Sequence, residues 1–472
     1  MAKAAPAAVE LLDSFQPPET GDGGEFRWTA GTFRVRIPEG AVGGMLVVDA
    51  LCYFEQGEQV LRVEGADGRE LASFAMAQWR RPYPVRLPAG RPLELVFRLN
   101  KTIPSHLKSG DRRELGVRVY GLRVTNTEDA WFATPPVGMC LESTSRCNLN
   151  CLTCPTRADR GFRLDGLTEL PVDWALEIVR TSPECRTFAL HGTGEPLLSN
   201  TFREILRRAP ADPPRLAFST NLTLLDGEIL DLILSGPVKE IIVSLDAASP
   251  QTYRLIRGHD LAKTLANVRS LVQARNSSGR RLPRLLAHMV LLRMNLGELP
   301  DFVRLAADLG LDGVAFWQAN EGCAFDWVVE RDGFRFDYRE QSLCNAPEES
   351  RRILAGAIRL ARNLGLEVLL DVALRTPCFP EDSAPAGRLT RPQDCPYPWK
   401  EAIILSDGTV RFCPLQAGGL MLGRLGPGVG INDIWNSPEA RRCRAALAAG
   451  KLPEICRGSG CQYATPEGAG PG

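Results

Sequence analysis

The sequence predicts an α/β protein in three parts: an all-β segment, a parallel part-barrel and a small cysteine-rich tail. Short β-type runs fill residues 1–132, and strand and helix patterns alternate from residue 137 onward. After residue 345 another helix and strand lead into a tail that is rich in glycine and cysteine. We therefore expect domains at 1–132, 137–345 and 346–472.

The first segment consists of short runs such as FRWTAGTFRVRIPE, GMLVVDALCYFE and LELVFRL, which are separated by glycine, proline and charged turns. This pattern is typical of a β-sandwich of about 100 residues. The stretch TEDAWFATPP at 127–136 ends in a proline pair, so it is expected to link this domain to the next.

The second segment repeats a strand followed by a helix. Its strand candidates are VGMCLEST, RTFALHG, RLAFST, EIIVSLD, LLAHMVLL and GVAFWQA. Because these strands are continuously apolar and most are separated by helical stretches, they predict a partial (β/α)6 barrel with helices on its outside. In such barrels the chemistry takes place at the carboxyl ends of the strands.

Composition limits the possible functions. Lys+Arg and Asp+Glu both number 56, so no net charge recruits nucleic acid or an anionic membrane. No apolar run approaches a bilayer span, and Glu10 and Asp13 fall where a signal peptide needs an apolar core. In a chain that stays inside the cell, 14 cysteines favour metal or redox use over disulfides. We expect a cytoplasmic protein with neither a nucleic-acid nor a membrane partner.

One loop, directly after the first barrel strand, carries three cysteines. The stretch STSRCNLNCLTCPT at 143–156 places Cys147, Cys151 and Cys154 within eight positions. Thiolates held this close suit an iron–sulfur cluster, and three of them leave one iron of a [4Fe–4S] cluster without a protein ligand. The loop resembles the CxxxCxxC loop of the radical SAM superfamily, in which the open iron binds S-adenosylmethionine (SAM).

The ends of the second and third strands also resemble this family. HGTGEP at 191–196 is similar to the family's glycine–glutamate–proline motif, which implies that Gly194 and Glu195 line the amino group of SAM. A bare backbone allows close approach, and a carboxylate pairs with an ammonium. The third strand ends in FSTN, where Ser219 and Asn221 are expected polar contacts.

The fourth strand reads VSLDAAS and is followed by TYRLIRG. This is similar to a family pattern that implies SAM ribose and carboxylate contacts for Ser244 and Arg257. Asp246 is expected to face the substrate. Each of these residues falls at or after the end of a predicted strand, where barrel active sites lie.

The tail holds a second group of cysteines. Twelve residues separate Cys395 from Gly408, four more lead to Cys413, and SDGT is an expected hairpin turn. The spacing resembles the start of SPASM and twitch modules. Because the tail lacks the crowded cysteine run of a full SPASM module with its two clusters, we expect one auxiliary [4Fe–4S] cluster, as in twitch proteins; a zinc site is the alternative. The expected ligands are Cys395, Cys413, Cys456 and Cys461. Cys443 lies within a predicted helix and is expected to be a packed thiol.

Two further barrel residues are of interest. Cys323 lies just past the sixth strand in a glycine-flanked loop. It is a candidate hydrogen-atom donor, because an S–H bond is weaker than most C–H bonds; the alternative is a buried loop cysteine. His288 lies inside a strand and is expected to be a satisfied barrel residue rather than a base.

The resemblance implies that a reduced cluster cleaves SAM to a 5′-deoxyadenosyl radical, which removes hydrogen from a C–H bond. A flavodoxin or ferredoxin is the expected electron donor. We expect a carbohydrate- or cyclitol-like small molecule to be epimerised or oxidised, because the all-β start lacks the winged-helix pattern of many peptide-modifying relatives. A peptide substrate is the first alternative, and a non-catalytic redox sensor is the second.

Overall fold

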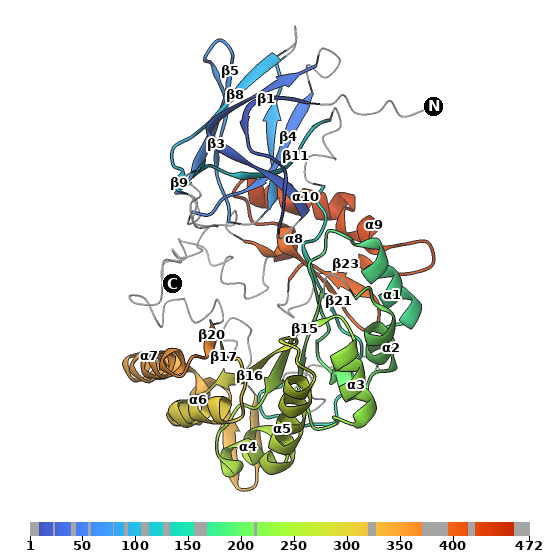
Figure 1. The fold of residues 1–472 in the computed structure, drawn as a ribbon, viewed down its shortest axis with the longest axis vertical. Helices are drawn as coiled ribbons and strands as arrows, with labels where there is room; N and C mark the ends of the chain where they lie inside the picture. The colour runs from blue at the N-terminus through green and yellow to red at the C-terminus, as the bar shows by residue number, and fades with distance from the viewer. Residues whose placement is uncertain are drawn as a thin grey trace.

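The computed structural model describes an N-terminal antiparallel sheet, an open parallel barrel with helices on its outside, and a C-terminal group of short elements (Figure 1). Among the described residues, no helix is long and apolar enough to cross a membrane. The described residues are 9–21, 24–38, 44–54, 58–78, 80–88, 93–104, 113–125, 133–154, 168–211, 215–319, 327–370, 395–413 and 421–456.

The N-terminal strands form one nearly closed antiparallel sheet, which confirms the expected all-β domain (Figure 1). The long strand β3 (Gly24–Ile37) organises it, because its first half pairs with β2 and β11 and its second half with β1 and β8. Alternate residues of β3, such as Phe33 and Val35, are fully buried. The other strands are β1 (Glu10–Phe15), β2 (Glu19–Gly21), β4 (Met45–Leu51), β5 (Val60–Gly65), β6 (Glu70–Ala75), β7 (Arg81–Arg86), β8 (Leu93–Leu99) and β11 (Arg118–Thr125), with β9 (Ile103–Pro104) and β10 (Glu114–Leu115) as a separate pair.

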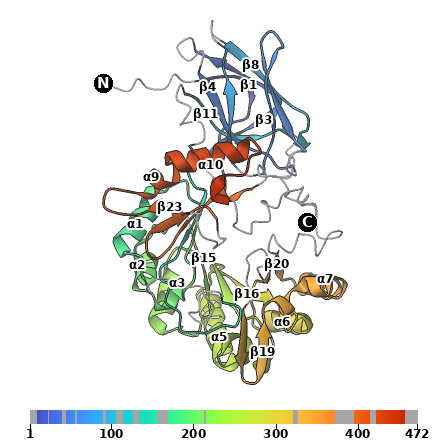
Figure 2. The same cartoon turned by 180° about the vertical axis from the view of Figure 1, so that it is seen from behind.

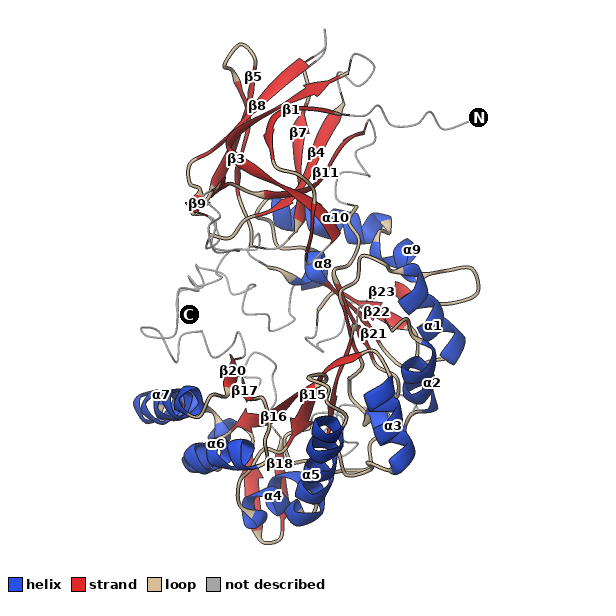
Figure 3. Ribbon diagram, viewed as in Figure 1, coloured by secondary structure: helices blue, strands red, loops and turns tan. Residues whose placement is uncertain are grey.

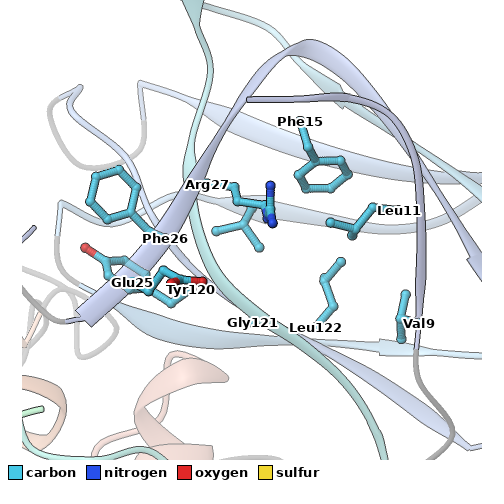
Figure 4. Close-up of a pocket in the computed structure, with 10 residues that line it drawn as sticks. Val9, Leu11, Phe15, Glu25, Phe26, Arg27, Tyr120, Gly121 and Leu122 are labelled. Carbon is cyan, nitrogen blue, oxygen red and sulfur yellow. The ribbon is translucent and has the colours of Figure 1, made fainter. Parts of the chain in front are cut away.

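A pocket of about 220 Å³ lies between β1, β3 and β11 (Figure 4). Leu11, Phe15 and Leu122 give it an apolar wall. The Arg27 guanidinium crosses it and donates a hydrogen bond to the Gln16 carbonyl at 3.2 Å. All of its lining residues belong to the N-terminal segment, so the pocket is separate from the barrel.

The central strands pair in parallel and in chain order, as the sequence predicts. They form an open arc with the helices on its outer side (Figure 3). The six strands are β12 (Gly138–Leu141), β13 (Thr187–Ala189), β14 (Leu216–Thr220), β15 (Val238–Ser244), β16 (Arg284–Leu291) and β17 (Gly313–Gln318). The helices are α1 (Val172–Thr181), α2 (Asn200–Arg208), α3 (Gly227–Ser235), α4 (Pro250–Arg257), α5 (Leu261–Ser277) and α6 (Leu299–Asp308). A further unit, α7 (Pro347–Asn363) and β20 (Glu367–Leu370), extends the sheet beside β17.

One face of this sheet packs against the helices. Residues such as Phe188, Phe218 and Phe316 pack with the helices in one large core. Because successive strand residues point to opposite faces, their neighbours lie on the concave face. These neighbours include the small buried residues Ala189 and Ala217.

The C-terminal elements are joined to the barrel through its sheet. Strand β21 (Glu401–Ile404) pairs in parallel with β12, and β22 (Thr409–Arg411) and β23 (Met421–Arg424) continue the sheet in antiparallel fashion. Ala402 and Ile404 are fully buried in the same core as the barrel strands. The tail is thus continuous with the barrel at the edge formed by β12.

Helix α10 (Pro438–Ala448) lies between the N-terminal sheet and the barrel (Figure 2), and α8 (Tyr397–Lys400) and α9 (Ile431–Trp435) lie next to it (Figure 1). Arg444 is fully buried, donates to the carbonyls of Pro398 and Trp435 at 2.7 and 2.8 Å, and so ties the three helices together. Trp435 donates to the Thr134 carbonyl at 2.8 Å. The linker from the N-terminal domain is therefore fixed to the tail as well as to β12.

Candidate active site

The three-cysteine loop follows β12 at the carboxyl edge of the sheet, as expected. Cys151 is buried, Cys154 is half-buried and Cys147 is exposed. The Leu152 amide donates to the Ile256 carbonyl at 2.8 Å, which fastens the loop to the end of α4. Burial raises the pKa of the Cys151 thiol, and the Arg257 guanidinium opposes that rise. A thiolate at this position is thus stabilised by a cation of the chain itself.

Arg257 links the loop to β15. Its guanidinium donates to the Cys151 sulfur at 3.2 Å and to the Ser244 carbonyl, and its Nε lies 3.2 Å from Asp246 Oδ2. Burial acts to lower the pKa of Arg257, but Asp246 and Cys151 outweigh it and hold the pKa above its usual value. Arg257 therefore stays cationic beside the loop.

Asp246 is fixed from both sides. It is buried and adopts a left-handed backbone with φ of 64°. Its Oδ1 accepts from the Val290 amide at 2.7 Å, and Oδ2 faces Arg257. In this arrangement the Asp246 carboxylate orients Arg257, and the substrate-facing role expected from the sequence stays a prediction.

The GTGEP loop packs directly on the cysteine loop. A Cβ at Gly194 would meet the carbonyl oxygens of Thr144 and Arg146, so only glycine fits. The Glu195 amide donates to the Arg146 carbonyl at 2.8 Å. The motif glycine is thus required for the contact between the two loops.

Glu195 is buried and bridges the ends of β13 and β14. Its carboxylate accepts from Thr220 Oγ1 at 2.6 Å, the Leu197 amide at 3.1 Å and the Asn221 amide at 2.8 Å. Since a carboxylate has about four acceptor positions, one remains for an ammonium. Burial raises the pKa of Glu195, and these hydrogen bonds oppose the rise.

The remaining polar candidates lie at the ends of β14 and β15. Ser219 Oγ is buried and has no hydrogen-bond partner among the described residues. Asn221 donates to Asn148 Oδ1 at 3.0 Å and so supports the cysteine loop. Ser244 contributes its carbonyl to Arg257. The unpaired Ser219 hydroxyl is therefore the one best suited to a ligand.

His288 corrects one expectation. It is buried on β16 with its ring 4.3 Å from that of Trp317, but its Nε2 has no hydrogen-bond partner within the described part of the chain. It is therefore not a satisfied barrel residue. Burial lowers the pKa of His288 to about 4, so the ring is neutral near pH 7 and can exchange a hydrogen bond with a ligand.

The hairpin formed by β18 (Val328–Arg331) and β19 (Phe334–Asp337) lies against the cysteine loop and is hydrogen-bonded to its backbone. Trp327 donates to the Leu152 carbonyl at 3.0 Å, and Arg331 donates to the carbonyls of Asn150 and Leu255. Sequence reasoning missed these residues. The signal was the Asp332–Gly333 pair, whose positive φ angles of 49° and 77° are those of a tight hairpin turn.

The tail cysteines are partly within the described residues. Cys395 and Cys413 pack against the barrel core, and the expected SDGT turn is present, with Gly408 at a φ of 88°. Cys443 is buried on α10, as expected, and also shares a hydrogen bond with Cys456. The Cys456 sulfur raises the pKa of Cys443, and burial adds to the rise. Cys461 and Cys323 lie outside the described residues.

Comparison with known families decides the class. Residues 141–306 match the model of the radical SAM superfamily, and residues 395–462 match SPASM, an iron–sulfur cluster-binding domain. The chain therefore carries a radical SAM domain followed by a SPASM iron–sulfur cluster-binding domain. The first match contains the cysteine loop and the GTGEP loop, and the second contains Cys395 and Cys461.

Individual relatives match parts of this chain. The tungsten-containing aldehyde ferredoxin oxidoreductase cofactor-modifying protein of Pyrococcus furiosus is 29% identical over 178 residues, which is 37% of this chain and 49% of that protein. The PqqA peptide cyclase of Granulibacter bethesdensis is 23% identical over 332 residues, 68% of this chain and 79% of the relative. Streptococcus suis SuiB, solved with its precursor peptide SuiA, has a TM-score of 0.51 at 12% identity over 66% of this chain and 67% of SuiB. This last likeness concerns the fold alone.

The radical SAM domain brings a [4Fe–4S] cluster that binds SAM, and the SPASM domain brings auxiliary iron–sulfur chemistry. The donor set fits the first, because three thiols share one loop beside a buried guanidinium and an unpaired Ser219 hydroxyl. No three described His, Cys, Asp or Glu side chains are spaced to hold a single metal ion. A cluster places its thiolates on different irons, so it requires no such convergence. When bound, cluster and SAM supply hydrogen-atom abstraction from a C–H bond.

Proposed function

We propose that this radical SAM/SPASM protein is an enzyme that modifies a peptide. One observation carries the proposal: the match to PqqA peptide cyclase extends over 68% of this chain, more than either domain alone. The carbohydrate or cyclitol substrate expected from the sequence has no such support. This match favours the peptide alternative over the carbohydrate expectation, and the epimerase or dehydrogenase type is likewise without support.

The concave face is compatible with an extended substrate. Ala189, Ala217 and Ala315 contribute short side chains to this face. His288 Nε2 and Ser219 Oγ have no hydrogen-bond partner in the part of the chain that the structure describes. A peptide backbone carries a donor and an acceptor at each residue, which suits isolated polar groups of this kind. The neutral imidazole of His288 accepts from an amide or donates to a carbonyl, depending on its tautomer.

The proposal assigns roles to the chain's own residues. Cys147, Cys151 and Cys154 hold the radical cluster, and Gly194, Glu195, Ser219, Asn221, Ser244 and Arg257 surround SAM. One auxiliary [4Fe–4S] cluster on Cys395, Cys413, Cys456 and Cys461 exchanges an electron with the substrate radical, and Cys323 is kept as the candidate hydrogen donor. A flavodoxin or ferredoxin is the proposed electron source.

The test follows deuterium from substrate to cofactor. The anaerobically reconstituted enzyme is given SAM, a strong reductant and a perdeuterated form of a short peptide encoded beside its gene, and 5′-deoxyadenosine is analysed by mass spectrometry. Deuterium in 5′-deoxyadenosine, with a mass change in the peptide, supports the proposal. Transfer from a perdeuterated sugar fraction of the cell extract, and none from the peptide, contradicts it.

A further inference from the structure

Glu142, the residue directly after β12, is a buried carboxylate that sequence reasoning did not single out. Its Oε2 accepts from the amide and the hydroxyl of Thr193, each at 2.7 Å. Its Oε1 accepts from the amide of Ser406 at 3.2 Å and from its hydroxyl at 2.7 Å. One side chain thus satisfies four donors from two distant segments.

These two segments have different functions. Thr193 immediately precedes Gly194 and Glu195, the candidate contacts of the SAM amino group. Ser406 lies in the turn between β21 and β22 and belongs to the SPASM domain. The carboxylate of Glu142 therefore joins the SPASM hairpin to the GTGEP loop.

A third branch returns to the cysteine loop. The Ser406 and Thr168 hydroxyls are 2.7 Å apart, and the Thr168 amide donates to Ser145 Oγ at 2.8 Å. Ser145 lies two residues before Cys147. The network is buried or half-buried throughout, so its hydrogen bonds are stronger than those exposed to water.

We propose that Glu142 is a positioning residue through which the SPASM hairpin sets the SAM-binding geometry of the barrel. SAM affinity then depends on Ser406, although Ser406 belongs to the other domain. The inference goes beyond the proposed peptide chemistry and holds for any substrate. Its experiment reads SAM binding, so it succeeds or fails independently of the substrate class.

The hydrogen-bond pattern makes the carboxylate irreplaceable. Each carboxylate oxygen accepts from one backbone N–H group, and a backbone N–H group can only donate. In Glu142→Gln the new NH₂ group therefore opposes the amide of Thr193 or that of Ser406, whichever way it turns. One branch of the network must break, while the volume of the side chain is kept.

The experiment measures SAM dissociation constants by equilibrium dialysis on the anaerobically reconstituted enzyme. Ser406→Ala removes one hydroxyl, and it should weaken SAM about five-fold or more, within the usual range of coupling between sites. The matched control is Ser437→Ala, which removes a serine hydroxyl of the same domain that accepts from the Ala440 amide at 3.2 Å outside the network. The control should change SAM affinity by less than about two-fold.

Repeating the Ser406→Ala measurement in a variant that already lacks the Glu142 link distinguishes an effect through Glu142 from a general destabilisation of the protein. Once Glu142→Gln has broken the link, adding Ser406→Ala should cost less SAM affinity than it does in the wild type, because only the Thr168 branch remains to be lost. Thr193→Val serves as that background if Glu142→Gln does not fold. The electron paramagnetic resonance signal of the reduced, SAM-bound cluster should shift in Ser406→Ala and not in Ser437→Ala, at equal iron content. Unchanged affinity in Ser406→Ala, or an equal loss of affinity in both backgrounds, overturns the proposal.

Discussion

Arg257→Ala is the substitution for which the structure gives the largest expected effect. The side chains of Arg257 and Asp246 are only 10% and 2% exposed, and their Nε and Oδ2 atoms are 3.2 Å apart. Removing the guanidinium leaves the Asp246 carboxylate buried and unpaired. Loss of one partner from a buried ion pair costs about 3–5 kcal/mol of the free energy of unfolding.

The same helix supplies the control. Arg254, three residues earlier on α4, pairs with Asp332 at 3.4 Å, and these side chains are 75% and 55% exposed. Arg254→Ala should therefore change the free energy of unfolding by about 0–1 kcal/mol. Both variants keep the length of the helix and lose the same charge, so the difference between them reports burial of the pair.

The assay is urea denaturation of the anaerobically purified enzyme. Unfolding is followed by circular dichroism, and the iron content is measured in parallel. Adding Asp246→Asn to Arg257→Ala removes the uncompensated charge and should restore about 1–3 kcal/mol. The reasoning is refuted if Arg257→Ala is no more destabilising than Arg254→Ala, or if the double variant loses the sum of the two single effects.

Three further outcomes are expected. Replacing Cys147, Cys151 and Cys154 together by Ala should abolish reductive SAM cleavage and leave about four irons, those of one auxiliary cluster; zinc or no metal in this variant contradicts the auxiliary assignment. Because burial raises the pKa of Glu195 and an ammonium partner would lower it, SAM affinity should fall as pH drops through that raised pKa, and Glu195→Gln should flatten the pH profile. Trp327→Phe removes the hydrogen bond to the cysteine loop, a loss of about 0.5–1.5 kcal/mol, together with part of the ring that contacts Tyr338, and it should release iron to a chelator faster than the wild type.

Local patterns were sufficient for the barrel and the cysteine loop. Each barrel strand is an apolar run that is buried on both faces or lines the concave face, so composition alone indicates it. The roles of the glycines in the GTGEP and SDGT stretches can also be predicted from the sequence, because Gly194 must approach a carbonyl closely and Gly408 has a positive φ. In these places the backbone conformation itself selects the residue.

Contacts between distant segments could not be predicted in this way. The pairing of β21 with β12 joins residues more than 250 positions apart, and nothing in the sequence of either strand indicates which strand it pairs with. The bonds of Glu142 to Ser406 depend on the same pairing, because Glu142 follows β12 and Ser406 follows β21. The sequence predicts a satisfied environment for His288, which is wrong because the ring packs against Trp317 and its Nε2 finds no hydrogen-bond partner among the described residues.

Strand β12 joins the radical SAM domain and the SPASM domain in one continuous sheet. This strand pairs with β13 on one side and β21 on the other, and it ends in the loop that carries the three cysteines. The backbone ladder continues past its end, where the Glu142 amide donates to the Ile404 carbonyl at 2.8 Å. A tail joined by a flexible linker would leave the separation between two redox centres variable. Here that separation is set by a shared sheet and a buried carboxylate, which suits transfer of an electron between fixed positions.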